Sequence, residues 1–219
     1  MGLTKEYRER LEKLATTNLS DACDRLGVRG AALHILPMHG TKIIGRAVTI
    51  KMTAAGLTPS KHHLGVEAIE AAEEGDVVVV DNGGSEEASC WGGILATAAK
   101  VKGIAGVVVD GAVRDADEYE ELDFPVWAKT ALPITARGRI MQDSYNVMVR
   151  IGGVQVRPED VIVGDASGIV VIPQEKLEEV LDVAEKILAK ETAMTKEILA
   201  GKSILEVDKK FSYERMLDE

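Results

Sequence analysis

The sequence predicts an α/β domain in which short valine-rich strands alternate with amphipathic helices. Two all-apolar runs, 77–80 and 107–109, lie between turn-forming residues, as strands covered on both faces do. A segment with apolar residues at helical spacing separates them, and this alternation is typical of layered α/β folds. The chain has 219 residues, 46% of them hydrophobic, which is enough for one sizeable core, so we expect a single domain over residues 1–219.

The first third of the chain is expected to hold two short helices followed by a strand. Residues 4–14 form a charged amphipathic pattern, and Ser20 is the expected N-cap of a second helix that ends at Gly27. A stretch with Gly, His and Pro then leads to a strand over 42–53, which we expect Gly45 to interrupt.

The middle of the chain is expected to alternate between helices and strands. In order, these are a helix from Ser60 to residue 72, a strand within 75–84, a helix that opens at Gly92-Gly93, and strands over 104–110 and 124–130. In the helix after Gly93, we expect the apolar side to be formed by Ile94, Leu95, Ala98 and Val101.

The last third is expected to hold two strand pairs and a long helix. One pair, 147–156, turns at Gly152-Gly153, and the other, 157–173, turns around a Gly-Asp dipeptide. A helix from about residue 174 ends at Gly201. Because this helix is long and a detached tail follows it, we expect the segment 174–219 to contact a neighbouring subunit.

Composition and charge exclude several classes of protein. The formal net charge is −10 and no cluster of Lys or Arg occurs, so nucleic acid is not an expected partner, because phosphate binding needs a basic face. No apolar run approaches the ~18 residues of a membrane span, and the charged N-terminus lacks a signal core, so we expect no membrane association and a cytoplasmic location. Cys23 and Cys90 lie far apart without a C-x-x-C motif, which favours reduced, buried thiols.

An adjacent Arg-Asp pair, Arg114 and Asp115, follows the apolar strand 104–110 after a short turn. Because such a strand is buried along its length, polar chemistry is confined to its end. If the helix that opens at Gly92-Gly93 begins nearby, its free N–H groups and Arg114 could hold a carboxylate, and Asp115 could hold Mg²⁺. A surface salt bridge beside a turn is the simpler alternative, and the spacing alone leaves both open.

Other motifs give weaker signals. The run VVVVDNGGS from Val77 lacks G-x-G-x-x-G spacing and no P-loop occurs, so dinucleotide or methyl-donor binding is not expected. The histidines lack H-E-x-x-H spacing, and the candidate nucleophiles lack a catalytic context: His34, His39, His62 and His63, and Ser85, Ser89 and Cys90.

Several of these stretches together resemble one known family. The runs WGGILA from Trp91 and GIAGVVVDGAVRD from Gly103 to Asp115 resemble the signature of the RraA-like family, which includes divalent-metal 4-hydroxy-4-methyl-2-oxoglutarate / 4-carboxy-4-hydroxy-2-oxoadipate aldolases. Supporting stretches are LSDACDRLG, GRAVT, EGDVVVVD and VIVGDASGIVVIP. The resemblance covers roughly residues 15–175 and implies a compact α/β/α domain like the swivelling phosphohistidine domain, assembled as a trimer or hexamer.

Carried over by position, the resemblance implies a site for the enolate of pyruvate. Residues Gly92, Gly93, Ile94 and Leu95 would bind the pyruvyl carboxylate of a 2-oxo acid substrate through the helix N-terminus. Arg114 would bind substrate, and Asp115 would bind the cofactor, Mg²⁺ or Mn²⁺, which acts as a Lewis acid. The same enolate arises when oxaloacetate loses CO₂, so oxaloacetate decarboxylase activity is implied as a side reaction.

The sequence departs from the family pattern at Gly93, where many members carry Asp or Glu. In characterised aldolases of the family, the C-terminal helix of a neighbouring subunit supplies a further catalytic acid, and Glu191 is the best-placed candidate for it here. If neither acid is replaced, proton transfer is expected to suffer while metal and pyruvate still bind.

Two other functions are associated with sequences of this kind. A regulatory binding protein of the RNase E inhibitor type would act by protein contact without a metal, and an acidic surface is compatible with that. The retained Arg114-Asp115 pair disfavours it, since a pure binder need not keep a metal ligand beside a carboxylate clamp. Such sequences also carry the older label of demethylmenaquinone methyltransferase, but this sequence contains no motif for a methyl-donor site.

Overall fold

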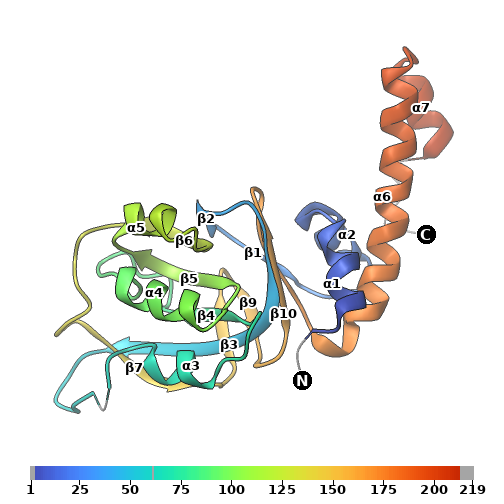
Figure 1. Ribbon diagram of the computed structural model, residues 1–219. Helices are drawn as coiled ribbons and strands as arrows, with labels where there is room; N and C mark the ends of the chain where they lie inside the picture. The colour runs from blue at the N-terminus through green and yellow to red at the C-terminus, as the bar shows by residue number, and fades with distance from the viewer. Residues whose placement is uncertain (1–2, 61, 213–219) are drawn as a thin grey trace.

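The computed structural model describes residues 3–60 and 62–212 (Figure 1). The helices are α1 (Lys5–Glu12), α2 (Thr16–Arg25), α3 (Val66–Ala71), α4 (Gly93–Val101), α5 (Ala116–Glu121), α6 (Leu177–Leu199) and α7 (Ile204–Phe211), with a short 3₁₀ turn η1 (Gln174–Lys176). The strands are β1 (Ala31–Ala32), β2 (Leu36–His39), β3 (Ile43–Ala54), β4 (Val77–Asp81), β5 (Gly106–Val113), β6 (Val126–Ala131), β7 (Ile140–Tyr145), β8 (Val149–Ile151), β9 (Val154–Val156), β10 (Val161–Asp165) and β11 (Gly168–Ile172). In the described ranges, no helix is long and apolar enough to cross a membrane.

Nine of these strands form one mixed sheet, in the order β1-β11-β10-β3-β4-β5-β6-β2, with β7 paired to β3. β3, β4, β5 and β6 are parallel to one another, and β8 pairs with β9 in a separate hairpin. The register places Val108 beside Val79 and Trp127. Because the strands are parallel, their carboxyl ends share one edge of the sheet, which is where ligands bind in open α/β folds.

The sheet curls until its two outermost strands come close together. β1 and β2 stand at opposite ends of the strand order, yet only residues 33–35 separate them in sequence. Four consecutive Cα–Cα steps span at most about 15 Å, so the two edges of the sheet cannot lie far apart. The curl gives the sheet an inner and an outer face.

Alternation along the strands determines which residues face inward and outward. Val77, Val79 and their neighbours belong to an inner cluster with residues of the β8–β9 hairpin. Val78 and Val80 belong to an outer cluster under α3, α4 and α5. Farther along the sheet, the outer residues of β10 and β11 pack under α1, α2 and α6. Two groups of helices therefore flank the sheet (Figure 1), which confirms the α/β class and the long C-terminal helix.

Strands β4 and β6, the two antiparallel pairs and helix α6 confirm their sequence predictions. β5 is also found, but it continues to Val113, so the turn expected between residue 110 and the Arg-Asp pair is part of the strand. The strand over 42–53 is not interrupted at Gly45. β3 runs unbroken from Ile43 to Ala54. A Cβ on Gly45 would lie 2.9 Å from Cγ2 of Val77 and closer still to the Gly75 carbonyl oxygen. Glycine is needed here because two chain segments approach closely, not because the strand ends.

Helix α2 begins at Thr16, earlier than the expected cap at Ser20. The N–H and hydroxyl of Thr16 donate to the carboxylate of Asp165 at 2.8 and 2.7 Å, and the Asn18 side chain accepts the N–H of Ala15 at 3.2 Å. The N-terminus of α2 is therefore capped mainly by Asp165 of the β10–β11 turn. This residue is far away in sequence, so no local pattern predicts the cap.

Helices α3 and α4 also differ from expectation. The helix expected from Ser60 spans only Val66–Ala71, after Gly65 in the left-handed region at φ 82°, and residue 61 lies outside the described residues. In α4, the prediction of which residues form the packed side is only partly correct. Leu95 is buried with Ala96 and Ala99, but Ala98 is exposed, and Ile94 and Val101 are 81% and 84% exposed.

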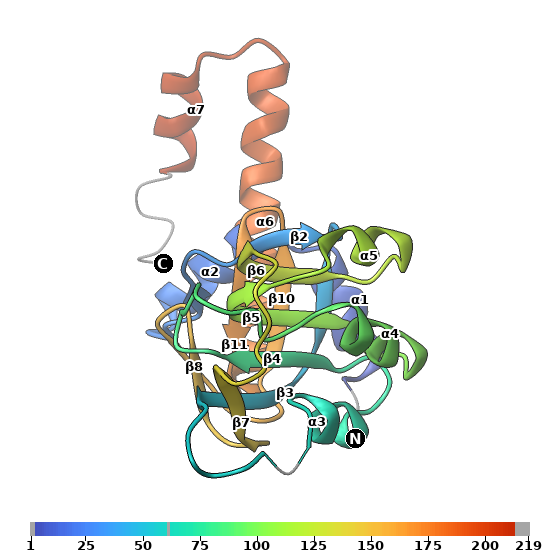
Figure 2. The same cartoon turned by 90° about the vertical axis from the view of Figure 1, so that its left-hand side faces the viewer.

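Three short strands, β1, β2 and β7, were not predicted, and the tail after α6 is not detached. α6 projects beyond the sheet, and α7 folds back beside it (Figure 2). Ser203 caps α7, and Lys202 and Lys210 both pair with Glu197 of α6. Residues 213–219 lie outside the described part of the chain. Contact of the segment 174–219 with a neighbouring subunit stays a prediction.

Candidate active site

The Arg114-Asp115 pair and the start of α4 meet at the end of β5. Residues before α4 run alongside the last residues of that strand, because the N–H of Cys90 donates to the Ala112 carbonyl oxygen at 3.0 Å. One step further, the N–H of Arg114 donates to the Trp91 carbonyl oxygen, also at 3.0 Å. These backbone bonds place Gly92 and Gly93 beside the pair, as the sequence predicted they could lie.

Asp115 joins the two halves of the site. It occupies the left-handed region at φ 58° and ψ 42° and is the residue from which α5 begins. Its Oδ2 accepts the N–H of Gly93 and the Nε–H of Arg114, each at 3.1 Å. The pair is thus a half-buried cluster held against a helix start rather than an isolated surface salt bridge.

Gly92 is the residue that lets this approach happen. A Cβ at this position would lie 2.7 Å from Oδ2 of Asp115 and 3.1 Å from Cγ and Nε of Arg114. Any side chain would therefore push both functional groups away from the helix start.

The first turn of α4 offers donors for an anion. Of its N–H groups, that of Gly93 is used by Asp115, and that of Ala96 donates to the Gly92 carbonyl oxygen at 3.0 Å. The N–H groups of Ile94 and Leu95 have no acceptor among the described residues. Free donors at the positive end of a helix dipole, with a guanidinium beside them, form an environment suited to a carboxylate.

Tyr119 of α5 holds the backbone of the Arg114-Asp115 pair in place. It is buried, and its hydroxyl donates to the carbonyl oxygen of Arg114 and lies 3.5 Å from that of Trp91. Burial, with the charge of Asp115 as a smaller cause, raises the pKa of Tyr119. The phenol therefore acts as a fixed neutral donor. Tyr119 is not among the site residues predicted from the sequence, although its position four residues after Asp115 in a helix places it on the same face as Asp115.

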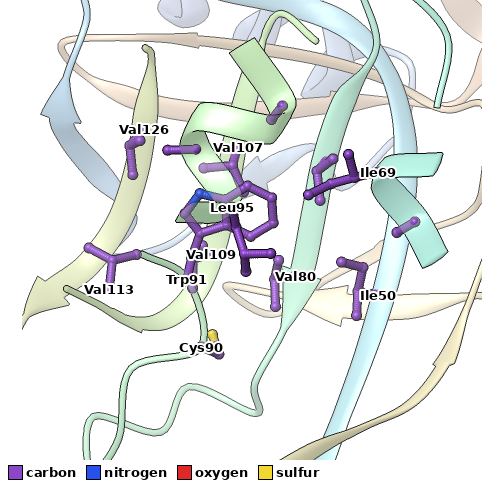
Figure 3. Packing of buried hydrophobic residues seen from close by; sticks show 14 of the residues in the cluster. Ile50, Ile69, Val80, Cys90, Trp91, Leu95, Val107, Val109, Val113 and Val126 are labelled. Carbon is purple, nitrogen blue, oxygen red and sulfur yellow. The ribbon is translucent and has the colours of Figure 1, made fainter. Parts of the chain in front are cut away.

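A cavity of about 390 Å³ opens beside these groups, which is in the range of small-molecule sites. Its floor is apolar, and Figure 3 shows Trp91 and Leu95 together with β5 valines in the underlying cluster. His62 and His63, set aside from the sequence, line the wall. The charged side chains among the described lining residues are Arg114, Asp115 and Arg137, so the cavity favours a small anion.

The residues present fit a hard divalent cation that uses one protein ligand. Oδ1 of Asp115 accepts no hydrogen bond from the described residues. Groups of three or more His, Cys, Asp or Glu that could hold a metal are absent from the described ranges. Mg²⁺ commonly binds through one or two carboxylates, with waters and substrate oxygens completing its octahedron, so one aspartate suffices where a zinc site would need more.

Two further candidate residues are Glu191, which lies apart from these groups, and Cys90, whose thiol is unreactive. Glu191 lies on α6, where its carboxylate accepts a hydrogen bond from Nδ2 of Asn18 at 2.7 Å. It is not among the residues that line the cavity, so one chain alone does not bring it there. Cys90 lines the cavity, but burial raises the pKa of its thiol to about 12. It is a buried free thiol, as is Cys23.

Comparison with known proteins assigns this chain to a family. The model of the RraA-like family, described as Aldolase/RraA, matches residues 16–171, and the chain belongs to that family. The chain is 34% identical over 207 residues to a Halalkalibacterium halodurans protein named "Putative 4-hydroxy-4-methyl-2-oxoglutarate aldolase", covering 92% of this chain and 94% of that protein.

Two other relatives differ in length or in described role. The chain is 30% identical over 209 residues to Protein DlpA of Legionella pneumophila, covering 94% of this chain but only 34% of DlpA, so it spans about a third of that relative. Streptomyces coelicolor RraAS2, described as an unusual member of the RNase ES inhibitor RraA protein family, superposes with a TM-score of 0.78 at 28% identity. That match covers 92% of this chain and 99% of RraAS2.

Proposed function

We propose that this chain is a divalent-metal-dependent lyase of the class II aldolase type, which releases pyruvate from a pyruvyl-containing hydroxy-oxo acid. The observation that carries the proposal is that three groups meet at one cavity. These are the guanidinium of Arg114, the carboxylate of Asp115 and the free N–H groups at the start of α4. The relative named as an aldolase supports the same reaction class.

Each group has a role in binding a 2-oxo acid. The free N–H groups of Ile94 and Leu95, with Arg114, bind the carboxylate of the pyruvyl unit. Asp115, whose Oδ1 accepts no hydrogen bond from the described residues, would hold Mg²⁺ or Mn²⁺. When bound there, the cation supplies Lewis-acid polarisation of the 2-oxo group.

The reaction breaks the carbon–carbon bond between C3 and C4 of the substrate. The electron pair of that bond moves toward the 2-oxo group and gives the enolate of pyruvate. Arg114 places a fixed positive charge where this negative charge develops, and the buried Tyr119 keeps the Arg114 backbone in position. Loss of CO₂ from oxaloacetate gives the same enolate, so oxaloacetate decarboxylation is part of the proposal.

Pyruvate release, coupled to lactate dehydrogenase, tests the proposed function. 4-Hydroxy-4-methyl-2-oxoglutarate and oxaloacetate are supplied separately, with Mg²⁺, with Mn²⁺ and with EDTA, and metal-only rates are subtracted because metals alone decarboxylate oxaloacetate. We expect protein-dependent pyruvate release that EDTA abolishes. Equal rates with metal and with EDTA would contradict the proposal.

A regulatory role is the second candidate, favoured by the similarity to RraAS2, a relative described within an RNase ES inhibitor family. It predicts no pyruvate in any arm of the assay, together with inhibition of a purified ribonuclease E by the chain. The opposite pattern, with pyruvate release and no inhibition, favours the lyase.

We also propose a homo-oligomer, a trimer or hexamer, in which a neighbour's Glu191 adds an acid to the site. Exposed apolar side chains on two surfaces support association: Ile94 and Val101 on α4, and Leu199, Ile204 and Leu205 at the α6–α7 end. Light scattering measures the assembly mass. A monomer would contradict this proposal without touching the assignments of Arg114 and Asp115.

A further inference from the structure

The space above Gly93 is filled by a carboxylate from another helix. A Cβ on Gly93 would overlap the side chain of Glu118, with Oε1 at 3.0 Å and two other carboxyl atoms closer. The sequence leaves position 93 without an acid, but Glu118 places one where a side chain of residue 93 would begin.

The geometry of α5 explains this placement. Glu118 lies three residues after Asp115, and its N–H donates to the Asp115 carbonyl oxygen at 3.1 Å, so it belongs to the first turn of the helix. Residues three apart share one face of a helix. That face packs against α4, so Asp115 bonds to the N–H of Gly93 while Glu118 lies against its Cα.

The carboxylate of Glu118 has no structural task that would explain its position. None of the hydrogen bonds or ion pairs between described residues involves it. The side chain is exposed, and it does not cap α5 by accepting the N–H of Asp115. It is an unpaired anion against the Cα of Gly93, whose N–H bonds to Asp115. Glu118 is not among the residues that line the cavity, so it can act only on a substrate group that extends from the cavity toward Gly93.

Resting on the proposed function, we propose that Glu118 is the residue that accepts the proton of the substrate's C4 hydroxyl group during aldol cleavage. As the C3–C4 bond breaks, the C4 oxygen keeps its electrons and becomes a carbonyl oxygen, and its proton passes to the Glu118 carboxylate. The electron pair of the broken bond forms the enolate, and a proton then adds to C3 to give the methyl group of pyruvate. No proton is gained or lost overall.

This role separates the two reactions of the site. Oxaloacetate in its keto form has no C4 hydroxyl proton to remove. Its C4 is a carboxylate, which leaves as CO₂. Aldol cleavage should therefore depend on Glu118, whereas decarboxylation should not. A purely structural role for Glu118 would affect both reactions to the same extent.

The test compares Glu118→Gln, which keeps the shape of the side chain, with Asp117→Asn, an exposed acid of the same turn. We expect Glu118→Gln to lower kcat for 4-hydroxy-4-methyl-2-oxoglutarate by about 100-fold, the usual scale of general acid–base catalysis. Oxaloacetate decarboxylation should change little, as should binding of Mn²⁺ and pyruvate measured by calorimetry. Asp117→Asn should match the unmodified chain in both reactions.

A second test moves the carboxylate from position 118 to position 93. Glu118→Ala removes the side chain that blocks position 93, and Gly93→Asp in that background returns a carboxylate from α4. We expect the double variant to recover part of the aldol activity, and the same background with Gly93→Asn to recover none.

Each outcome decides the matter. Equal losses in both reactions, or no loss in either, would overturn the role of Glu118 while leaving the proposed lyase standing. A chain that decarboxylates oxaloacetate but never cleaves the hydroxy acid would also overturn it. If the unmodified chain releases no pyruvate from either substrate, the proposed function fails and this inference falls with it.

Discussion

Oδ2 of Asp115 accepts the N–H of Gly93 at 3.1 Å, so the residue that begins α5 satisfies the first N–H of α4. This bond fixes two helix starts to each other at the end of β5. Aspartate tolerates the left-handed conformation that the link requires better than most residues do. The fold therefore holds these groups in place before any ligand binds, which the proposed reaction would require.

Gly92→Ala is expected to disable the site without unfolding the protein. The added methyl group would lie 2.7 Å from Oδ2 of Asp115 and would displace the pair. Displacements of about 1 Å commonly cost about 100-fold in rate, so we expect a loss of that size in kcat/KM for pyruvate release. Ala98→Ser on the exposed side of α4 is the control. Unchanged kinetics in Gly92→Ala would show that the pair does not act in the reaction.

Tyr119→Phe is expected to weaken both stability and activity. Its hydroxyl donates to the carbonyl oxygen of Arg114, and removing it leaves that oxygen without this donor. A lost buried hydrogen bond costs about 1–2 kcal/mol, which urea unfolding measures. We expect kcat to fall several-fold, because the Arg114 backbone loses its support. A stable variant with full activity would rule out this supporting role.

Asp165→Ala is expected to destabilise the fold at neutral pH more than at acidic pH. Burial alone raises the pKa of Asp165, but hydrogen bonds from Thr16 and Ser167 and the charge of Lys42 outweigh it, so the pKa lies below its ordinary value. A depressed folded-state pKa contributes stability above the unfolded value of about 3.9, and that contribution disappears as the pH falls through the folded pKa.

Urea unfolding at two pH values measures this effect. We expect Asp165→Ala to cost about 1–3 kcal/mol at pH 7, since hydrogen bonds to a charged group are lost, and clearly less near pH 2. Glu121→Gln, an exposed acid on α5, should cost little at either pH. A cost for Asp165→Ala that does not depend on pH would contradict the role of its charge.

Both thiols are expected to be unreactive in the folded chain. Burial raises the pKa of Cys23 and of Cys90 to about 12, so only on the order of one thiol in ten thousand is ionised at pH 8. A disulfide reagent should react slowly with the native protein and rapidly with both cysteines in denaturant. A fast reaction in native buffer would show that one of them is accessible.

The elements that carry the candidate site could be predicted from the sequence because their signals are local. Arg114 and Asp115 follow a buried strand, and Gly92-Gly93 opens a helix, so each could be located by pattern alone. Their contact does not follow from the pattern, because it depends on the backbone bond between Arg114 and Trp91. The same limit applies to Glu118, since helical spacing places it near Asp115 but only packing places it against α4.

The errors in the fold have two physical causes: contacts between residues distant in sequence, and apolar residues that are exposed. Gly45 looked like a break, but its lack of a side chain serves contact with residues more than 25 positions away. Thr16 had no local cap because Asp165 supplies one from a distant turn. The exposed apolar residues Ile94 and Val101 led to the wrong packed side for α4, since an exposed apolar residue at helical spacing looks like core in a single sequence.

The most direct test of the central claim is Mg²⁺-dependent pyruvate release from oxaloacetate by the unmodified chain, Asp115→Asn and Asp117→Asn, measured side by side. The assignment of Asp115 as the metal ligand predicts that Asp115→Asn loses nearly all protein-dependent activity, while Asp117→Asn keeps it. If Asp115→Asn were as active as the unmodified chain, with the same dependence on Mg²⁺, the site described around Arg114 and Asp115 would not be the catalytic one.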